Sequence, residues 1–545
     1  MKSMKKLFAL ALALCMVLAL AACGGSGSAP SEDAGSAPAA DSGAAPAAEA
    51  VNNDADGNGR ADKVVYASTQ QYTSLVPFLN PKTYTAAVFE PLGSFMSYGE
   101  DFQGLLMESW EYDGDRTYTV KLYENIHDSE GNPITAHDVE FCYAPEQVGA
   151  SEMGMLTGAI ESVKAVDDYT VEFVWATTPI IGAFEHVVSY VNIVSQAAYE
   201  ASGDGMASKP VGTGPYVVDS WTSGVSMNLK VNENYWAEGD QVKFPRQQQP
   251  VDEIEIDTIS ETSQLTMALQ TGTIDMTADI ASQDAPNFLE GGAYSAGYTV
   301  EESLATAPKN LLINHSPDAK TSDPNLRMAI MAAIDPAFIS AMVNGGANQP
   351  TYGLGSPMNP DYDEAAFQSY LPEHSMDKAK EYLAASNYPN GTDITLLFID
   401  GGIANDIAEA IQGQLAQIGI TVNIRGEIFP NWLAAKNDPA AWELNLSELS
   451  GFYVTDLWES AFVKQNEVFA TDAELAELQP AVREAMGVET HSQETVNAGQ
   501  KAISEGGFCA PLLVQLQYNV YDNTLIDAIC YTGEGAVCVQ GFTFK

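Results

Sequence analysis

A short acidic segment of the chain has the spacing of oxygen ligands in a calcium-binding loop. The residues in this pattern are Asp54, Asp56, Asn58, Gly59 and Asp62. Such a loop normally carries a glutamate at its twelfth position, where this chain has Val65. We therefore interpret the segment as a solvated acidic linker without a metal, and a calcium site is the alternative.

A second chemical feature is the thiol of Cys23, which follows an apolar run over residues 7–20. Lys2, Lys5 and Lys6 precede this run, which is too short to span a membrane and is typical of a secretory signal peptide over residues 1–22. The sequence Leu-Ala-Ala-Cys at 20–23 resembles a bacterial lipobox, in which the cysteine thiol receives a diacylglycerol. This resemblance predicts lipidation of Cys23 and an extracytoplasmic protein anchored to the bacterial cell membrane. An ordinary signal peptide with a chance cysteine is the alternative.

The remaining cysteines and histidines do not form a recognisable catalytic or metal-binding pattern. Outside the signal peptide and Cys23, the cysteines are Cys142, Cys509, Cys530 and Cys538. An oxidising compartment permits disulfides, and Cys530 with Cys538 could close a short loop. The six histidines are scattered, and HExxH, GxSxG and GxxxxGK are absent from the sequence. We expect neither an enzyme nor a cofactor.

Composition and charge separate a linker from a globular body. Residues 23–60 are rich in Gly, Ser, Ala, Pro and Asp, so they cannot bury enough apolar surface to fold and are expected to be a lipid-anchored disordered linker. The rest is long enough for two or three domains. With 24 Lys+Arg against 73 Asp+Glu, the formal net charge is −49. Such a charge repels phosphate polyanions and argues against nucleic acid as a partner.

Hydrophobic periodicity predicts many hairpins in the first half of the body and a parallel unit in the second. Alternation predicts a strand at 62–68 and hairpins at 110–124, 163–175 and 212–231. Thr135 can cap the start of a helix that begins over 136–143. Apolar spacing at 3.6 residues predicts further helices at 261–271, 325–335 and 376–386. A strand at 393–399, a helix at 404–418 and a strand at 420–425 together predict a βαβ unit.

Six motifs carry a family resemblance. They are ESWEYDGDRTYTVKLYENIHDSEGNPITAHDVEF (108–141), GTGPY (212–216) with Asn234, Tyr235 and Trp236, LTMALQTGTID (265–275), NLRMAIMAAID (325–335), MDKAKEYLAASNYPNG (376–391) and IQGQLAQIGITVNI (411–424). In type and order, these segments resemble those of the family 5 (peptide/nickel-type) extracellular solute-binding proteins of ABC transporters. The resemblance covers the chain from about residue 63 to its C-terminus.

The resemblance implies an α/β protein with a type II periplasmic-binding fold. Two α/β lobes would face each other across a cleft, joined by a hinge, with a β-rich domain inserted in the first lobe. The first lobe would comprise residues 61–88, 205–305 and 508–545. The inserted subdomain would comprise 89–204, and the second lobe 306–507.

Ligand contacts are expected from loops at strand ends that face the cleft. The candidate ligand-binding residues are Gln70, Gln71, Tyr72, Trp432, Phe452, Tyr453, Asp456 and Trp458. In peptide-binding members of the family, an aspartate in the last of these loops pairs with the α-ammonium of the ligand. This chain has Phe452 and Tyr453 in that part of the loop and no acid between Leu449 and Thr455. The aromatic residues there could stack on a ligand or plug the core.

The resemblance implies a monomeric substrate-binding lipoprotein that captures an oligopeptide or peptide-like solute and delivers it to the permease transmembrane subunits of an ABC importer. A ligand-binding surface sensor or adhesin on the same scaffold is one alternative. Uptake of a non-peptide ligand, such as an opine, an oligosaccharide or a metal chelate, is another.

Overall fold

The computed structural model of the chain describes residues 53–545 apart from 79–81, 98–99, 149–156 and 533–534. The predicted signal peptide, Cys23 and most of the predicted linker lie outside the described residues. Within the described ranges, the helices are all too short or too polar to cross a bilayer.

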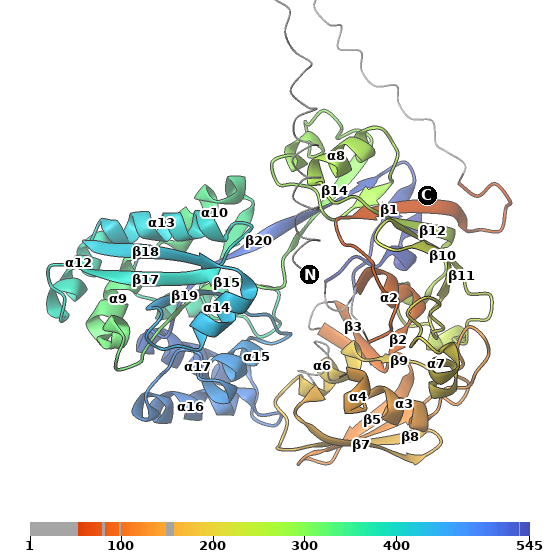
Figure 1. Cartoon of the computed structure of the whole chain (residues 1–545), viewed down its shortest axis with the longest axis horizontal. Coiled ribbons are helices and arrows are strands. Elements are labelled where there is room, and N and C mark those ends of the chain that lie inside the picture. Colours follow the sequence, from red (N-terminus) through yellow and green to blue (C-terminus); the bar gives the residue numbers. More distant parts are fainter. Residues whose placement is uncertain (1–52, 79–81, 98–99, 149–156, 533–534) are drawn as a thin grey trace, which may run out of the picture. The chain divides into compact units, whose positions relative to one another are not determined.

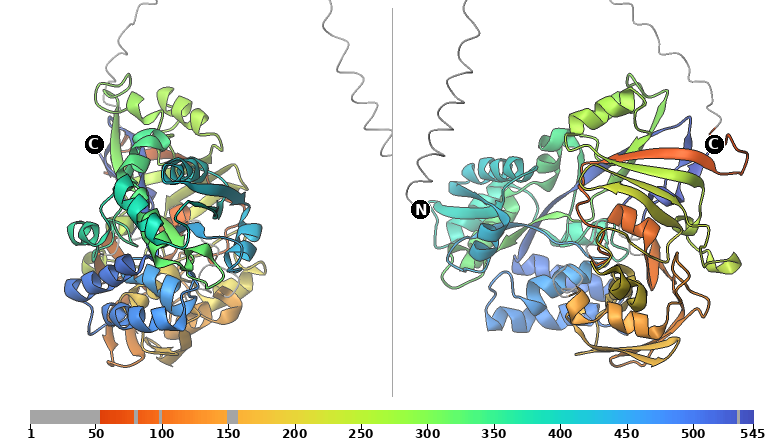
Figure 2. Two further views of the ribbon diagram at one scale, coloured as in Figure 1. Left: turned by 90° about the vertical axis from the view of Figure 1, so that its left-hand side faces the viewer. Right: turned by 45° about the vertical axis from the view of Figure 1, so that its right-hand side comes forward.

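A twelve-stranded sheet contains most of the strands (Figure 1, Figure 2). Its order is β10-β11-β12-β1-β13-β20-β15-β19-β17-β18, and β14 and β16 pair additionally with β20. The bounds are β1 (Ala61–Ser68), β10 (Tyr216–Thr222), β11 (Ser226–Val231), β12 (Val251–Thr258), β13 (Met276–Thr277), β14 (Tyr298–Leu304), β15 (Lys309–Ile313), β16 (Asn348–Pro350), β17 (Thr392–Ile399), β18 (Ile420–Glu427), β19 (Leu444–Glu448) and β20 (Cys509–Asp522). The predicted strand at 62–68 and the predicted hairpin within 212–231 are confirmed as β1 and β10–β11.

Strand β20 joins the two halves of this sheet. Its first residues, from Cys509, pair antiparallel with β15, and its later residues, up to Asp522, pair antiparallel with β14. The strand can be followed in Figure 1 from β15 to β14. The predicted lobe boundary at residue 508 therefore lies next to the start of a strand that belongs to both halves.

The predicted βαβ unit is confirmed. Strands β17 and β18 pair in parallel, and helix α13 (Ala404–Ala416) connects them. Ile407, Ile411 and Leu415 lie four residues apart on the buried face of α13, so its sequence matches the period of a helix packed on a sheet. The turn before β17 requires Gly391, whose φ is +93° and whose Cβ would lie 2.1 Å from the carbonyl oxygen of Gly419.

The segment predicted as the inserted subdomain is rich in antiparallel strands. One sheet has the order β5-β6-β8-β7, with β5 (Met107–Tyr112), β6 (Thr117–Leu122), β7 (Ile160–Asp167) and β8 (Thr170–Trp175). Two short pairs lie outside it: β2 (Glu90–Pro91) with β9 (Asn192–Ile193), and β3 (Gly93–Ser97) with β4 (Glu100–Gly104). The hairpins predicted at 110–124 and 163–175 are thus confirmed. In the core behind the sheet, the rings of Tyr118 and Phe184 stack at 4.2 Å.

The helices of the described chain flank these sheets. In the first half they are α2 (Lys82–Val88), α3 (Ala136–Cys142), α4 (Pro145–Val148), α6 (Ala183–Tyr190), α7 (Gln196–Ser202) and α8 (Thr262–Gln270). In the second half they are α9 (Pro324–Ala333), α10 (Pro336–Met342), α11 (Glu364–Tyr370), α12 (Met376–Ala385), α14 (Phe429–Lys436), α15 (Val454–Trp458), α16 (Asp472–Met486) and α17 (Gln493–Gly506). The predicted helices at 136–143, 261–271, 325–335 and 376–386 are confirmed as α3, α8, α9 and α12. Short helical turns include η2 (Pro245–Gln247) and η7 (Val539–Gly541), and β21 (Ile526–Ala528) pairs with β22 (Thr543–Phe544).

Candidate functional site

A cavity of about 440 Å³ is lined by residues that lie far apart in the sequence. Its size is that of a small-molecule pocket. The lining residues are Phe95, Met96, Phe244, Pro245, Arg246, Ser303, Leu304, Met358, Cys530, Tyr531, Thr532 and Gly535. They come from β3, from the end of β14, from η2 and the residue before it, and from two loops. They include residues of both predicted lobes and of the predicted insert. We call this the central cavity.

The walls of the central cavity are mostly apolar. Phe95 is 3% exposed and packs against Phe102 at a ring-centroid distance of 5.1 Å. On another side, its ring lies 4.4 Å from that of Phe452, which also contacts His186 at 4.7 Å. Met96 is 39% exposed and offers a flexible apolar side chain. These surfaces can bind the apolar part of a ligand.

One buried cation faces this apolar surface. Arg246 lies in η2 and is only 8% exposed. Its Nη1 lies 3.5 Å from Ser94 Oγ, and its Nη2 donates to the carbonyl oxygen of Ala86 at 3.3 Å. Gln540 donates to the same carbonyl oxygen at 2.7 Å. The guanidinium is therefore held in place by neutral acceptors.

The buried carboxyl group near Arg246 has other partners. Glu90 is 1% exposed, and its two oxygens accept hydrogen bonds of 2.7 Å from Tyr235 Oη and Trp236 Nε1. Burial raises the pKa of the Glu90 carboxyl, and these two hydrogen bonds and the charge of Arg246 oppose the rise. Glu90 thus fixes the two aromatic residues that follow the GTGPY motif.

The polar side of the cavity includes a hydroxyl network. Tyr531 Oη lies 3.3 Å from Glu301 Oε2 and accepts a hydrogen bond of 3.0 Å from Asn519 Nδ2. Asn519 also donates to Ser303 Oγ at 3.2 Å. Burial and the nearby Glu301 carboxylate raise the pKa of Tyr531, so its hydroxyl stays protonated near neutral pH. Hydroxyls held in this way can orient a ligand by hydrogen bonds.

The predicted ligand residues 70–72 follow strand β1. Gln70 and Gln71 are exposed, whereas Tyr72 is buried and makes an edge-to-face contact with Tyr84 at 5.4 Å. The Tyr72 carbonyl oxygen accepts a hydrogen bond from Trp221 Nε1 at 3.2 Å. None of the three is among the described residues that line the central cavity, and their role in binding stays a prediction.

The two predicted tryptophans are packed into the protein. Trp432 is 8% exposed, and its Nε1 donates to Asn445 Oδ1 at 3.0 Å. Trp458 is fully buried, and its Nε1 donates to the Leu354 carbonyl oxygen at 2.9 Å. Neither ring lines the described central cavity, and both have a packing role in this structure.

The loop from 451 to 456 lies next to the cavity wall through Phe452. Tyr453 lies against Gly182, at the start of α6 in the predicted insert. Asp456 lies in the first turn of α15, and its Oδ2 accepts a hydrogen bond from the Tyr453 backbone N–H at 3.2 Å. It therefore caps the helix. Of the eight predicted ligand residues, Phe452 is the one that the structure places in ring contact with a cavity-lining side chain.

The environment of Asp456 predicts how stability depends on pH. Burial, with the neighbouring Asp361 and Glu459 carboxylates, raises the pKa of Asp456 to about 7. An unfolded aspartate titrates near 3.9, so the folded state binds more protons between about pH 4 and pH 7. The free energy of unfolding should therefore fall as the pH rises through this window.

Replacing Asp456 by asparagine should remove part of this decrease in the free energy of unfolding. The asparagine side chain keeps an oxygen that can accept the hydrogen bond from the Tyr453 N–H. We expect the decrease in the free energy of unfolding from pH 5 to pH 8 to shrink by about 1 kcal/mol or more, measured by urea denaturation. Asp363→Asn is the control, because backbone hydrogen bonds lower the pKa of Asp363 and its removal should leave the decrease in place. An equal decrease in wild type and Asp456→Asn would contradict the assignment.

The family of the chain follows from comparison with known proteins. A family model described as "Bacterial extracellular solute-binding proteins, family 5 Middle" matches residues 101–457. The chain belongs to this family. As a member, it is an extracytoplasmic solute-binding protein of an ABC importer, which binds a peptide or another small ligand and works with a membrane permease.

Individual relatives agree with the family and the fold. The glutathione-binding protein GsiB of Escherichia coli (strain K12) is 28% identical over 377 residues, which are 67% of this chain and 69% of GsiB. The periplasmic binding protein DppA from Helicobacter pylori, solved with the peptide STSA, has a TM-score of 0.66 at 22% identity, over 90% of this chain and 99% of that one. NikA from Brucella suis, solved with Fe(III)-EDTA, has a TM-score of 0.71 at 20% identity, over 89% and 100%. The expected type II periplasmic-binding fold is confirmed.

A second, smaller cavity of about 300 Å³ is lined by residues of the predicted second lobe together with Ala510 and Pro511 of β20. It lies beside the start of α10, and its walls include Asp335, Tyr352, His374 and Pro511. All its lining residues fall between 331 and 511, so none of them comes from the predicted insert, which contributes Phe95 and Met96 to the central cavity. In family 5 the central cavity is therefore the stronger candidate for the ligand site.

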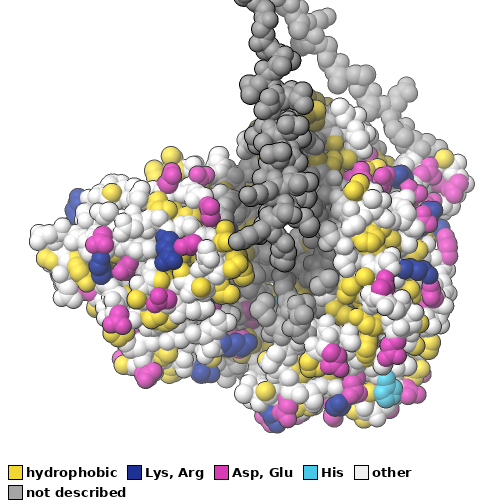
Figure 3. Space-filling model, in the orientation of Figure 1, with side chains coloured by type: hydrophobic (Ala, Val, Ile, Leu, Met, Phe, Trp, Pro, Cys, Tyr) yellow, Lys and Arg dark blue, Asp and Glu magenta, His cyan; other side chains and the backbone are white. Residues whose placement is uncertain are grey.

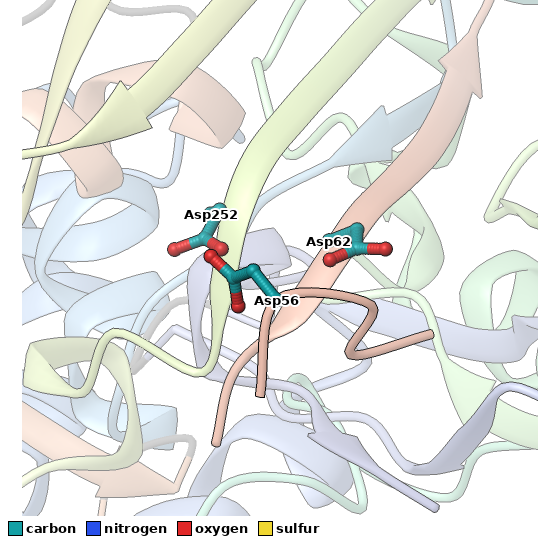
Figure 4. A group of neighbouring side chains, drawn as sticks. All are labelled: Asp56, Asp62 and Asp252. Atoms are coloured by element: carbon teal, nitrogen blue, oxygen red, sulfur yellow. The ribbon is translucent and has the colours of Figure 1, made fainter. Parts of the chain in front are cut away.

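The carboxylates of Asp56, Asp62 and Asp252 could supply oxygen ligands to a hard cation (Figure 4). One oxygen from each lies within 4.8 Å of the others. In the predicted linker, Asn58 Nδ2 donates to Asp252 Oδ2 at 2.8 Å, and Arg60 Nε lies 2.8 Å from Asp252 Oδ1. Residues 53–60 thus hydrogen-bond with the folded body, and Arg60 already neutralises one of the three carboxylates.

Sequence reasoning missed Arg246 and the other residues of the central cavity. Arg246 stands in the segment Phe244–Gln249, outside the family motifs, and its burial depends on contacts with residues 86 and 94. The one sequence feature that could have drawn attention to Arg246 is the scarcity of basic residues, since the chain has only 24 Lys+Arg.

Proposed function

We propose that this protein is the lipid-anchored receptor of an ABC importer, and that it holds a short peptide or peptide-like solute in the central cavity. The observation that carries the proposal is the cavity itself. Its walls combine apolar side chains, a few hydroxyls and a single charge, which is the composition of a site that binds small organic ligands.

The names of the relatives support a peptide-like ligand. GsiB is named for glutathione, which is itself a peptide, and the DppA structure contains the peptide STSA. The NikA structure contains Fe(III)-EDTA, so a metal chelate is the second candidate. The hydrophobic walls favour the peptide, because a chelate of several carboxylates would leave most of its charges against apolar surface.

The proposed role is capture and delivery without chemical change of the ligand. A hydrolase would need a nucleophile, a base and oxyanion donors within reach of one another. The described lining residues instead offer apolar contact and hydrogen bonds. The lipid anchor at Cys23 would keep the loaded protein near the permease.

Filling the central cavity should weaken ligand capture. We expect Met96→Trp to lower the affinity for a mixture of hydrophobic tripeptides at least tenfold, because the larger ring occupies the cavity. Calorimetry, supported by the ligand-induced rise in melting temperature, measures the effect. Met342→Trp is the control, since Met342 is 63% exposed on α10 and does not line the cavity. Unchanged affinity in Met96→Trp would place the ligand elsewhere.

A further inference from the structure

The charge of Arg246 has no ion-pair partner in the part of the chain that the structure describes. Among the described residues, its guanidinium makes polar contacts with the Ser94 hydroxyl and the Ala86 carbonyl. Both acceptors are neutral, so they orient the guanidinium without compensating its charge. A buried charge that lacks a paired counter-charge is costly, which is why such groups usually have a partner.

The buried carboxyl group of Glu90, which interacts with the charge of Arg246, does not fill this role. Each oxygen of Glu90 accepts a hydrogen bond, one from Tyr235 and one from Trp236, whereas the guanidinium of Arg246 contacts Ser94 and Ala86. Its charge acts on Arg246 only through space, with no direct ion pair among the described residues. The guanidinium therefore keeps N–H donors for a further acceptor, and the space next to it is the central cavity.

We infer that Arg246 binds a carboxylate of the ligand, and that the bound group is the C-terminal carboxylate of a short hydrophobic peptide. This inference rests on the proposed function. An arginine can hold a carboxylate through two parallel N–H···O bonds, which gives both strength and orientation. The carboxylate would form the direct ion pair that Arg246 lacks among the described residues.

The surroundings of Arg246 narrow the ligand class. Phe95, Met96 and Leu304 contribute apolar surface to the same cavity, and Arg246 is the one charged side chain among its described lining residues. A phosphate has about two charges and a polycarboxylate has more, so either would place unpaired charge against apolar walls. One carboxylate next to an apolar side chain matches the site, as in a peptide that ends in leucine or phenylalanine.

The charge of the whole protein points in the same direction. The chain has a formal net charge of −49, and acidic side chains are scattered over the face drawn in Figure 3. Such a surface repels anionic ligands. A peptide with a free amino group is zwitterionic, so it is not repelled as a whole and can still present a carboxylate to Arg246.

The test compares one mixture of tripeptides ending in leucine or phenylalanine in three forms: free, N-acetylated and C-terminally amidated. Calorimetry on the intact protein should show similar affinity for the free and N-acetylated forms and at least tenfold weaker binding of the amides. Arg246→Gln should bind the free form at least tenfold more weakly and should no longer distinguish it from the amide. Arg246→Lys, which keeps the charge, should retain part of the discrimination.

Lys243→Gln is the matched control. Lys243 lies three residues from Arg246 and donates to the Gly104 carbonyl oxygen, but it does not line the cavity. This variant should keep the full preference for the free carboxylate. Melting temperatures show whether each variant is folded, and the preference of the wild-type protein for acid over amide tests the inference without any variant.

The outcomes separate the two proposals. Equal binding of the acids and amides by the wild-type protein would overturn the role of Arg246 and leave peptide capture in place. An undiminished preference for the acid in folded Arg246→Gln would assign the carboxylate to another group. Binding of none of the three peptide forms would refute peptide capture itself, and the carboxylate site with it.

Discussion

Replacing Cys23 by serine will move the protein from the membrane fraction to the soluble extracytoplasmic fraction. The thiol of Cys23 stands directly after the Leu-Ala-Ala sequence and is the group that would receive the diacylglycerol. Each buried methylene of an acyl chain contributes about 0.8 kcal/mol, so two chains give stable anchoring where one is marginal. Serine has no thiol for this attachment, and the effect should be nearly complete.

Fractionation of cells with immunoblotting measures the distribution, and labelling with radioactive palmitate reports the lipid. Ser26→Ala is the control, because it changes the same part of the linker and leaves the thiol intact. Membrane retention of Cys23→Ser would contradict the lipid anchor. Equal solubility of wild type and Cys23→Ser would indicate an ordinary signal peptide.

The elements that sequence reasoning predicted correctly are those that depend on local pattern. The β17–α13–β18 unit has strands at the expected positions and a helix whose buried face repeats every four residues. Such patterns specify both the type of element and its buried face. The hairpin β5–β6 was predictable for the same reason, since Asp113-Gly114 forms its turn and Gly114 has a φ of +83°.

The central cavity depends on contacts between distant parts of the chain. Phe95, Arg246, Leu304 and Tyr531 span more than four hundred positions, and they meet in the folded protein. Arg246 is buried among residues that are distant in the sequence, including Ala86 and Ser94, and no period or motif in its own segment indicates this. The prediction that ligand contacts come from loops at strand ends did not specify which loops, so it could not identify the residues that line the central cavity.

In the segment 451–458, neighbouring aromatic residues have two different structural roles. Phe452 lies in ring contact with the cavity residue Phe95, whereas Trp458 points into the core between α15 and α17. Both residues are aromatic, but Phe452 precedes α15 and Trp458 is the last residue of that helix. The difference arises from the helical turn between them, which only the packing of the second lobe determines.

Truncating Trp458 to alanine should strongly destabilise the second half of the protein. The ring is fully buried, and its Nε1 donates to the Leu354 carbonyl oxygen at 2.9 Å. It also fills the space above Gly499, where an added Cβ would lie 2.6 Å from Trp458 Cζ3. Removing a buried tryptophan costs about 3–5 kcal/mol. For a cooperative unit of about 200 residues, 3 kcal/mol lowers the melting temperature by about 6–12 °C.

Differential scanning calorimetry measures this shift, and Phe429→Ala is the control because Phe429 is 57% exposed and should change the melting temperature little. Trp458→Phe should be intermediate, since it keeps the aromatic packing but leaves the Leu354 carbonyl oxygen without its donor. If Trp458 acts only in packing, folded Trp458→Phe will bind tripeptides as tightly as the wild type. A tenfold loss of affinity without a loss of stability would instead make Trp458 a ligand contact, as the sequence first suggested.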